Sequence, residues 1–96
     1  MNKYEIMYIV KTTLDEKAVK ETVDSLNRTI TDLKGNITNF KDMGQRELAY
    51  PIKKEISGFY YVITIEAPYE AVKEFDRKAG LNENILRHQV IRLDEE

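Results

Sequence analysis

The pattern of hydrophobic and polar positions divides the chain into six segments. Four of them are rich in β-branched and aromatic residues, a composition that is typical of strands. The predicted strands are residues 4–10, 36–50, 59–66 and 85–93. In the other two segments, apolar residues recur at three- and four-residue steps, which indicates the apolar face of a helix. The predicted helices are residues 14–33 and 68–80.

Residues near the ends of these segments predict where the helices begin and end. Thr13 together with Glu16 fits a capping box at the start of the first helix. Gly35 is expected to end that helix, because glycine adopts the left-handed backbone conformation without strain. Pro68 suits the first turn of the second helix, and Gly80 is expected to cap its end.

The alternation of apolar and polar residues is interrupted in the second predicted strand. Ile37 is odd-numbered, whereas Phe40, Leu48 and Tyr50 are even-numbered, so one face of a regular strand cannot hold all of them. An extra residue, a β-bulge, resolves the conflict. We expect the bulge at residues 42–44, because the glycine there tolerates the backbone conformation of a bulge. With the bulge in place, Leu48 and Tyr50 are expected to return to the core.

The order of the segments, strand–helix–strand–strand–helix–strand, predicts the fold. A right-handed crossover through the first helix makes the first two strands parallel, and the third strand, after a turn at residues 53–58, fits between them. This is the ferredoxin-like βαββαβ arrangement, a four-stranded antiparallel sheet with two helices on one face. We call the other face of the sheet the open face. At 96 residues, the chain is expected to form a single domain over residues 1–96.

The last predicted strand could bury either of its sides. Burial of Leu86 and Val90 would turn Arg87 to the opposite side, whereas burial of Ile85 and the other odd-numbered residues would turn His88 away. The alternation leaves both orientations open.

Composition and charge narrow the class of protein. The hydrophobic fraction is 42% and the charged fraction is 33%, as expected of a globular domain. The chain has no cysteine, which excludes disulfides and thiolate metal sites and fits the reducing cytoplasm. No apolar run approaches the roughly 18 residues of a membrane helix. The net charge of −2 argues mildly against indiscriminate nucleic-acid binding. Residues 14–33 carry five acids against three cations, however, whereas the last strand carries Arg87 and Arg92 with no acid until Asp94, so one surface can still be cationic.

Catalytic signals are weak. His88 is the only histidine, and without thiols it cannot complete the usual transition-metal sites. The sequence has neither a P-loop nor a dinucleotide-binding glycine motif. Enzymes of the acylphosphatase type share this fold and use an arginine in a glycine-rich loop, where this chain has Lys11, Thr12 and Thr13. The sequence therefore predicts a protein that is not an enzyme and that has neither a metal site nor a cofactor.

Apolar residues are predicted on the open face as well as in the core. Alternation turns Phe59 and Tyr61 toward the core, and turns Tyr60 and Val62 toward the open face. The predicted partner-protein interface consists of Met7, Ile9, Tyr60 and Val62. Tyr60 could alternatively stack on an RNA base, since its segment faintly resembles the third-strand motif of RNA recognition modules.

Residues 44–53, GQRELAYPIK, closely resemble the signature of the bacterial small-subunit (30S) ribosomal protein six family, and we call them the signature decapeptide. Similar segments of that family correspond to residues 4–6, 58–60, 67–68 and 81–87. The resemblance covers essentially the whole chain. The fold of the family is the same βαββαβ sheet.

The resemblance implies a structural protein of the cytoplasmic ribosome. Family members bind the central domain of small-subunit ribosomal RNA together with ribosomal protein eighteen, as a heterodimer, during assembly. In the signature decapeptide, Arg46 is a candidate phosphate ligand, because a guanidinium can donate two hydrogen bonds to one phosphate. The candidate RNA contacts are Lys3, Tyr4, Arg46, Lys53, Lys54, Arg87 and Arg92.

A competing interpretation is a ferredoxin-like ligand-binding or regulatory domain that forms homodimers through its open face. A stable homodimer in the absence of RNA and of a protein partner would favour it. The ribosomal interpretation, by contrast, involves neither a membrane nor a small-molecule substrate.

Overall fold

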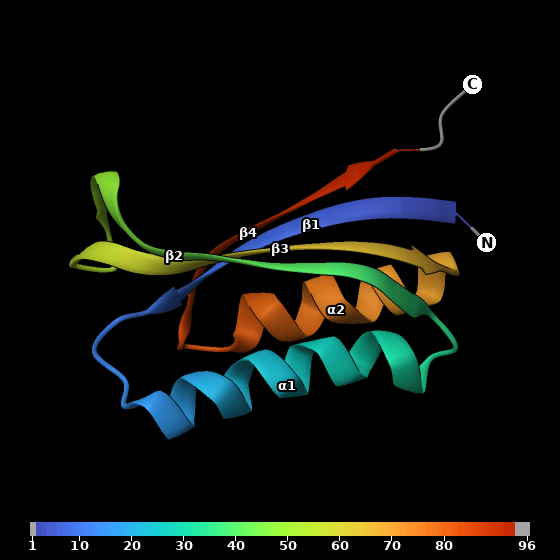
Figure 1. The fold of residues 1–96 in the computed structure, drawn as a ribbon, viewed down its shortest axis with the longest axis horizontal. Helices are drawn as coiled ribbons and strands as arrows, with labels where there is room; N and C mark the ends of the chain where they lie inside the picture. Colours follow the sequence, from blue (N-terminus) through green and yellow to red (C-terminus); the bar gives the residue numbers. More distant parts are fainter. Residues whose placement is uncertain (1, 94–96) are drawn as a thin grey trace.

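The computed structural model of the protein describes residues 2–93 and has the predicted order of strands and helices (Figure 1). The elements are β1 (Asn2–Lys11), α1 (Glu16–Asp32), β2 (Asn36–Ile52), β3 (Glu55–Ala67), α2 (Tyr69–Leu81) and β4 (Ile85–Arg92). The strands form one sheet in the order β2-β3-β1-β4, and all neighbours are antiparallel. Both helices lie on the same side of the sheet. The ferredoxin-like fold is confirmed.

The core lies between the sheet and the two helices. Even-numbered residues of β1 and odd-numbered residues of β3 face the helices, because the register pairs Ile6 with Ile63 and Tyr8 with Tyr61. Leu26 of α1 and Phe75 of α2 fill the helical side and are almost fully buried. Burial of each such side chain contributes roughly 1.5–3 kcal/mol, so packing of the helices onto β1 and β3 dominates the stability of the fold.

The helix ends differ from the predicted ones by one or two residues. The N-cap of α1 is Asp15 rather than Thr13, and the Asp15 carboxylate accepts a hydrogen bond of 2.8 Å from the Ala18 amide. In α2, Pro68 occupies the N-cap position, and the helix continues through Gly80 to end at Leu81. The prediction that Gly80 caps α2 is therefore wrong.

The end of α1 shows a second departure, because Lys34 rather than Gly35 has the left-handed backbone, with a φ of 73°. Gly35 is required for space instead. A Cβ atom at this position would lie 2.7 Å from Cγ2 of Ile30 and 2.8 Å from Cβ of Ala67. The chain thus passes close to the end of β3 as it enters β2.

The pairing of β2 with β3 has three register shifts where the sequence predicted one, and the third lies between Glu47 and Ile52. The predicted bulge is confirmed, since Asp42 and Gly44 pair with consecutive residues of β3 and Gly44 has a φ of 80°. A second irregularity, at Thr38, turns Ile37 and Phe40 toward the same face.

The bulge at residues 42–44 determines the position of the signature decapeptide. Beyond it, Gly44 pairs with Tyr60 and Arg46 pairs with Gly58, so both lie on the open face, and the pairing becomes irregular again after Glu47. Leu48 and Tyr50 line a hollow of that face, and 58% of Tyr50 is exposed. The prediction that Leu48 and Tyr50 return to the core is wrong.

The β2–β3 hairpin ends in a two-residue turn, because Ile52 pairs directly with Glu55. Both turn residues, Lys53 and Lys54, have positive φ angles, of 51° and 69°. Two-residue hairpin turns favour this mirror-image geometry, but asparagine and glycine normally adopt it. The predicted turn at residues 53–58 was too long, since β3 already begins at Glu55.

The hairpin bends away from the helices and covers one end of the open face (Figure 1). Ile9 on that face is only 2% exposed, although it lies outside the cluster of residues packed against the helices. The Lys53 ammonium donates a hydrogen bond of 3.0 Å to the carbonyl oxygen of Ile85, which ties the tip of the hairpin to β4. The hairpin therefore covers part of the open face.

The orientation of β4 is also settled by its pairing with β1. His88 pairs with Tyr8 and faces the helices, whereas Arg87 pairs with Ile9 and lies on the open face. A register shift in this pairing, beside Ile9, allows both Ile85 and Leu86 to be buried, one against the helices and one beneath the hairpin. β4 therefore follows neither of the two burial patterns that alternation alone allowed, because an odd-numbered and an even-numbered residue are both buried.

Replacement of Gly58 by alanine tests the contact between the hairpin and the sheet. A Cβ atom at Gly58 would overlap the Cγ2 atom of Ile9, which is held in a packed strand. We expect Gly58→Ala to lower the free energy of unfolding by about 1–3 kcal/mol, as measured by urea denaturation. Gly80→Ala is the matched control, because its new Cβ would lie 4.0 Å from the His88 ring. Equal stability of the two variants would show that the hairpin packs loosely.

Replacement of Lys54 by glycine tests the strain in the turn. A residue with a side chain is destabilised at a φ of 69°, and glycine is not. We expect Lys54→Gly to raise the free energy of unfolding by about 0.5–1 kcal/mol in the same assay. Lys41→Gly, within the regular part of β2, should instead lower it. A loss of stability in both variants would mean that the turn is not strained.

Candidate functional site

Three of the basic or protonatable side chains meet at the edge of the sheet where the hairpin tip contacts β4. Lys53, Arg87 and His88 line a hollow of about 300 Å³ beside the end of α2, and we call this hollow the basic edge. The Nε2 atom of His88 lies 2.8 Å from a carboxylate oxygen of Asp76, which fixes the imidazole ring. The side chains of the basic edge come from the hairpin turn (Lys53) and from β4 (Arg87 and His88).

Arg87 and Lys53 are held in place by hydrogen bonds within the protein. The Nη1 atom of Arg87 donates to the Tyr50 hydroxyl at 2.9 Å, so the guanidinium keeps further donors for a ligand. The Lys53 ammonium uses one of its three protons for the Ile85 carbonyl. Preorganised donors of this kind lose little side-chain entropy when they bind a phosphate.

The other candidate cations of the hairpin lie outside the basic edge. Arg46 is exposed on the open face, where its Nε atom donates to the Met43 carbonyl at 3.4 Å. Lys54 is exposed at the turn. Both extend the positive charge from the basic edge along the hairpin.

Lys3 and Arg92 lie at the opposite end of the sheet, on different faces: Lys3 is on the open face, whereas Arg92 pairs with Tyr4 and lies on the side of the helices. The Lys3 ammonium lies 3.9 Å from a carboxylate oxygen of Glu66, and Nη2 of Arg92 donates to the Asn2 side chain at 3.3 Å. Arg87 and Arg92 are five residues apart on β4, or roughly 17 Å at the rise of a strand. A ligand that contacts both ends of the sheet must therefore be extended along this edge.

Tyr4 is the one candidate RNA contact that the structure places inside the protein. Its side chain is 5% exposed and belongs to the core between sheet and helices. We therefore remove Tyr4 from the RNA contacts. Its even number already placed it on the same face as Ile6 and Tyr8, which was the signal available in the sequence.

Sequence reasoning missed Tyr50 and Leu48 as residues of the open face. They line a hollow of about 270 Å³ together with Met7, Ile9, Tyr60 and Arg87. Counting the alternation onward from the bulge, rather than from the core, would have found them. Of the four predicted partner contacts, Met7, Tyr60 and Val62 are partly exposed, whereas Ile9 is buried beneath the hairpin.

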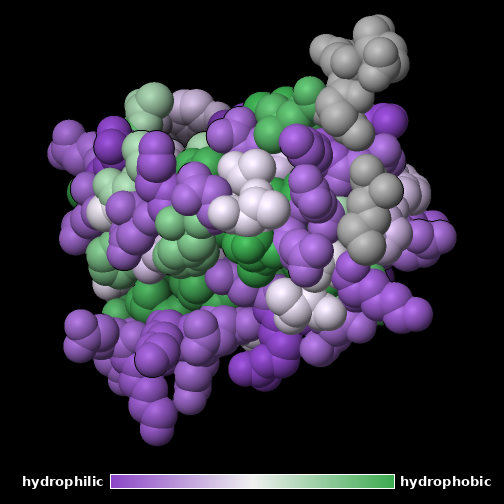
Figure 2. Space-filling view, turned by 45° about the vertical axis from the view of Figure 1, so that its right-hand side comes forward, coloured by the Kyte–Doolittle hydropathy of each residue, from purple (hydrophilic) through white to green (hydrophobic). Residues whose placement is uncertain are grey.

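Charge is distributed unevenly between the two layers of the molecule. The register places these charged residues on the open face: Lys3, Glu5, Lys11, Lys41, Arg46, Glu66 and Arg87. Cations outnumber acids there. Polar side chains cover the helical layer, at the bottom of Figure 2, and on α1 acids outnumber cations. An acidic protein thus presents a cationic surface on its sheet side.

The described residues show neither a metal site nor a membrane helix. Among residues 2–93, no three metal-binding side chains of histidine, aspartate or glutamate come together. Over the same range, neither helix is long and apolar enough to cross a membrane.

The comparison with family models and the comparison with solved structures identify the same protein family. The sequence model of the ribosomal protein S6 family matches residues 3–92. The structure is similar to the crystal structure of 30S ribosomal protein S6 from Thermotoga maritima, with 29% sequence identity and a TM-score of 0.90. That match covers 96% of this chain and 87% of the other. The chain belongs to the ribosomal protein S6 family, as the signature decapeptide predicted, and its role is that of a structural ribosomal protein.

Proposed function

We propose that the protein binds the central domain of small-subunit ribosomal RNA through its cationic sheet side, together with ribosomal protein eighteen. The main support for this proposal is the basic edge, where Lys53 of the hairpin turn and Arg87 of β4 line the same hollow. In a bacterium the complex forms in the cytoplasm, where ribosomes assemble. The protein acts by binding and positioning, without catalysis.

The RNA is bound mainly through its phosphates. Arg87 and Arg46 can each donate two parallel hydrogen bonds to a phosphate, and Lys53 and Lys54 add point charges. Lys3 on β1 extends the cationic surface along the open face toward the other end of the sheet, and Arg92 on β4 adds a cation at that end from the side of the helices. Phosphate contacts position a protein on RNA without reading its sequence. Specificity then comes from the shape of the RNA and from the second protein.

The second protein contacts the apolar part of the open face. Met7 pairs with Val62 there, and Tyr60 lines the neighbouring hollow with Leu48 and Tyr50. This surface adjoins Arg87, so protein and RNA can share one continuous interface. Ile9 supports the surface from below, since it is buried.

The competing homodimer through the open face is disfavoured by charge. Two copies facing each other would bring together the cations Lys41, Arg46 and Arg87 of each chain. Like charges at an interface oppose association. Ribosomal RNA, by contrast, is attracted by the same cations.

Loss of two arginines should reveal the phosphate contacts. We expect Arg46→Ala with Arg87→Ala to reduce the slope of log affinity against log salt concentration by roughly two units, about one for each lost contact. RNA binding is measured by filter retention in the presence of protein eighteen. The matched control is Arg28→Ala with Arg77→Ala on the helices, which should leave the slope unchanged. An unchanged slope in the first variant would contradict the proposed contacts.

The affinity for RNA should depend on the protein partner. The net charge of −2 predicts weak binding by the protein alone. Addition of protein eighteen should increase the affinity for a central-domain RNA fragment about 5–150-fold, the usual range of a coupling of 1–3 kcal/mol. A titration followed by fluorescence anisotropy measures this ratio. Equal affinities with and without protein eighteen would refute the cooperative part of the proposal.

A further inference from the structure

A row of aromatic rings crosses the core and ends at the surface beside α1. The ring centroids of Phe75 and Tyr8 are 5.8 Å apart, those of Tyr8 and Tyr61 are 5.5 Å apart, and those of Tyr61 and Phe40 are 5.8 Å apart. The first three rings are buried, but Phe40 is 43% exposed. The row therefore ends at Phe40, whose ring is exposed to solvent on its outer side.

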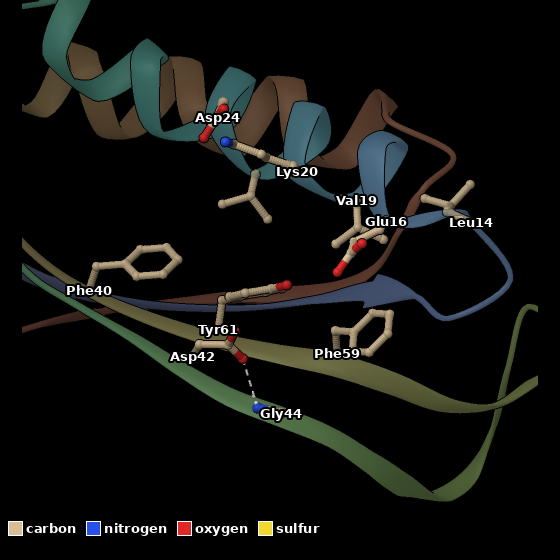
Figure 3. Close-up of a pocket in the computed structure, with 11 residues that line it drawn as sticks. Leu14, Glu16, Val19, Lys20, Asp24, Phe40, Asp42, Gly44, Phe59 and Tyr61 are labelled. Atoms are coloured by element: carbon tan, nitrogen blue, oxygen red, sulfur yellow. Dashed lines mark hydrogen bonds between the residues drawn. The ribbon is translucent and has the colours of Figure 1, made fainter.

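The exposed ring lies in a groove of about 580 Å³ between α1 and the strands β2 and β3. We call it the α1–β2 groove. Phe40, Phe59 and Tyr61 point from the strands toward the helix, and Val19 faces them from α1 (Figure 3). Leu14 and Val23 complete the apolar lining. Figure 2 shows exposed apolar atoms in the band between the helical layer and the sheet.

Acidic residues dominate the rim of this groove. Glu16 and Asp24 stand on α1, Asp42 stands on β2, and Lys20 is the cation among the lining residues. The Asp42 carboxylate is fixed by a hydrogen bond of 2.9 Å from the Gly44 amide, at the bulge (Figure 3). Burial raises the pKa of the Tyr61 phenol, and the nearby charge of Asp42 raises it further. The Tyr61 side chain thus remains neutral at the base of an acid-rimmed hollow.

These properties exclude three occupants of the groove. RNA is repelled by Glu16, Asp24 and Asp42. A second copy of the chain, placed groove to groove, would oppose the same acids. An added β-strand is disfavoured, because the bulges at Thr38 and Met43 interrupt the edge of the sheet along β2.

We propose that the α1–β2 groove docks a basic amphipathic segment of a protein, with two or three apolar side chains against Phe40, Phe59 and Val19. Lysines or arginines that flank these apolar side chains would lie against Glu16, Asp24 and Asp42. A helix laid in the groove supplies such anchors at three- and four-residue spacing. The segment extends the row of aromatic rings and covers Phe40.

The groove is separate from the proposed RNA surface. Phe40 and Tyr61 face the helices, whereas Arg46 and Arg87 lie on the open face of the sheet. One protein segment and the RNA can therefore be bound at once. The proposal goes beyond the RNA contacts and holds or fails independently of them.

A photocrosslinker at the exposed ring tests the proposal in the assembled particle. Phe40→p-benzoyl-phenylalanine is introduced into the full chain, small ribosomal subunits are isolated and irradiated, and the crosslinked segment is identified by mass spectrometry. We expect a protein segment in which two or three apolar residues are flanked by lysine or arginine. The same substitution at Tyr69, which is 63% exposed on α2, is the control position and should not capture that segment.

Charge reversal on the groove rim provides the second measurement. Added to the crosslinking variant, Glu16→Lys with Asp24→Lys should lower the crosslink yield about 10-fold, because the basic segment then meets like charge. Glu21→Lys with Asp32→Lys changes α1 by the same charge outside the groove and should leave the yield unchanged. Thermal unfolding checks that both charge variants remain folded.

Three results would overturn the proposal. The first is a crosslink from position 40 to RNA or to a second copy of this chain. The second is a crosslink to a protein segment without basic residues, or no crosslink at all in subunits that contain the variant. The third is an equal yield in the two charge variants. Failure of the RNA proposal would appear instead as an unchanged salt dependence in the Arg46 and Arg87 variant.

Discussion

An extra residue at Met43 shifts the alternation of side chains along β2 by one position. Even-numbered side chains therefore face the helices just before Met43 and the open face just after it. Before the bulge, Phe40 faces the helices and forms part of the α1–β2 groove. After it, Arg46, Leu48 and Tyr50 lie on the open face. A regular strand would send one of these two sets to the wrong side of the sheet, because side chains alternate strictly. The side of Phe40 in the α1–β2 groove and the side of Arg46 on the open face are therefore compatible only because of this bulge.

A further register shift, between Glu47 and Ile52, lies in the part of the hairpin that bends over the sheet and carries Lys53 to the basic edge. The closure is stabilised by burial of Ile9, by space at Gly58 and by the hydrogen bond from Lys53 to β4. It also requires two lysines in left-handed backbone conformations at the turn. Strain of this kind persists where the surrounding structure enforces it, and it is often found at functional sites. Here it brings Lys53 beside Arg87, where both can meet an anion.

Separation of charge between the two layers reconciles a net charge of −2 with a surface for RNA. The sheet side carries an excess of cations, and α1 carries an excess of acids. The acids near the sheet edge surround exposed apolar atoms instead of RNA contacts. A protein built in this way can hold RNA on one side and a basic protein segment on the other. That division suits a structural protein of the ribosome.

The sequence by itself determined the order of strands and helices, the fold and the family, because these follow from periodicity over short stretches and from the signature decapeptide. It also located the bulge at residues 42–44 through the glycine there, whereas the conflict between Ile37 and Phe40 is resolved by the separate irregularity at Thr38. Only the tertiary structure decided which residues of β4 are buried, that the hairpin closes over Ile9, and that the basic edge forms. Those outcomes depend on register and on contacts between residues more than 30 positions apart, such as Lys53 with β4. Local patterns carry no information on such contacts, so the decapeptide identified the family whereas the folded hairpin defined the site.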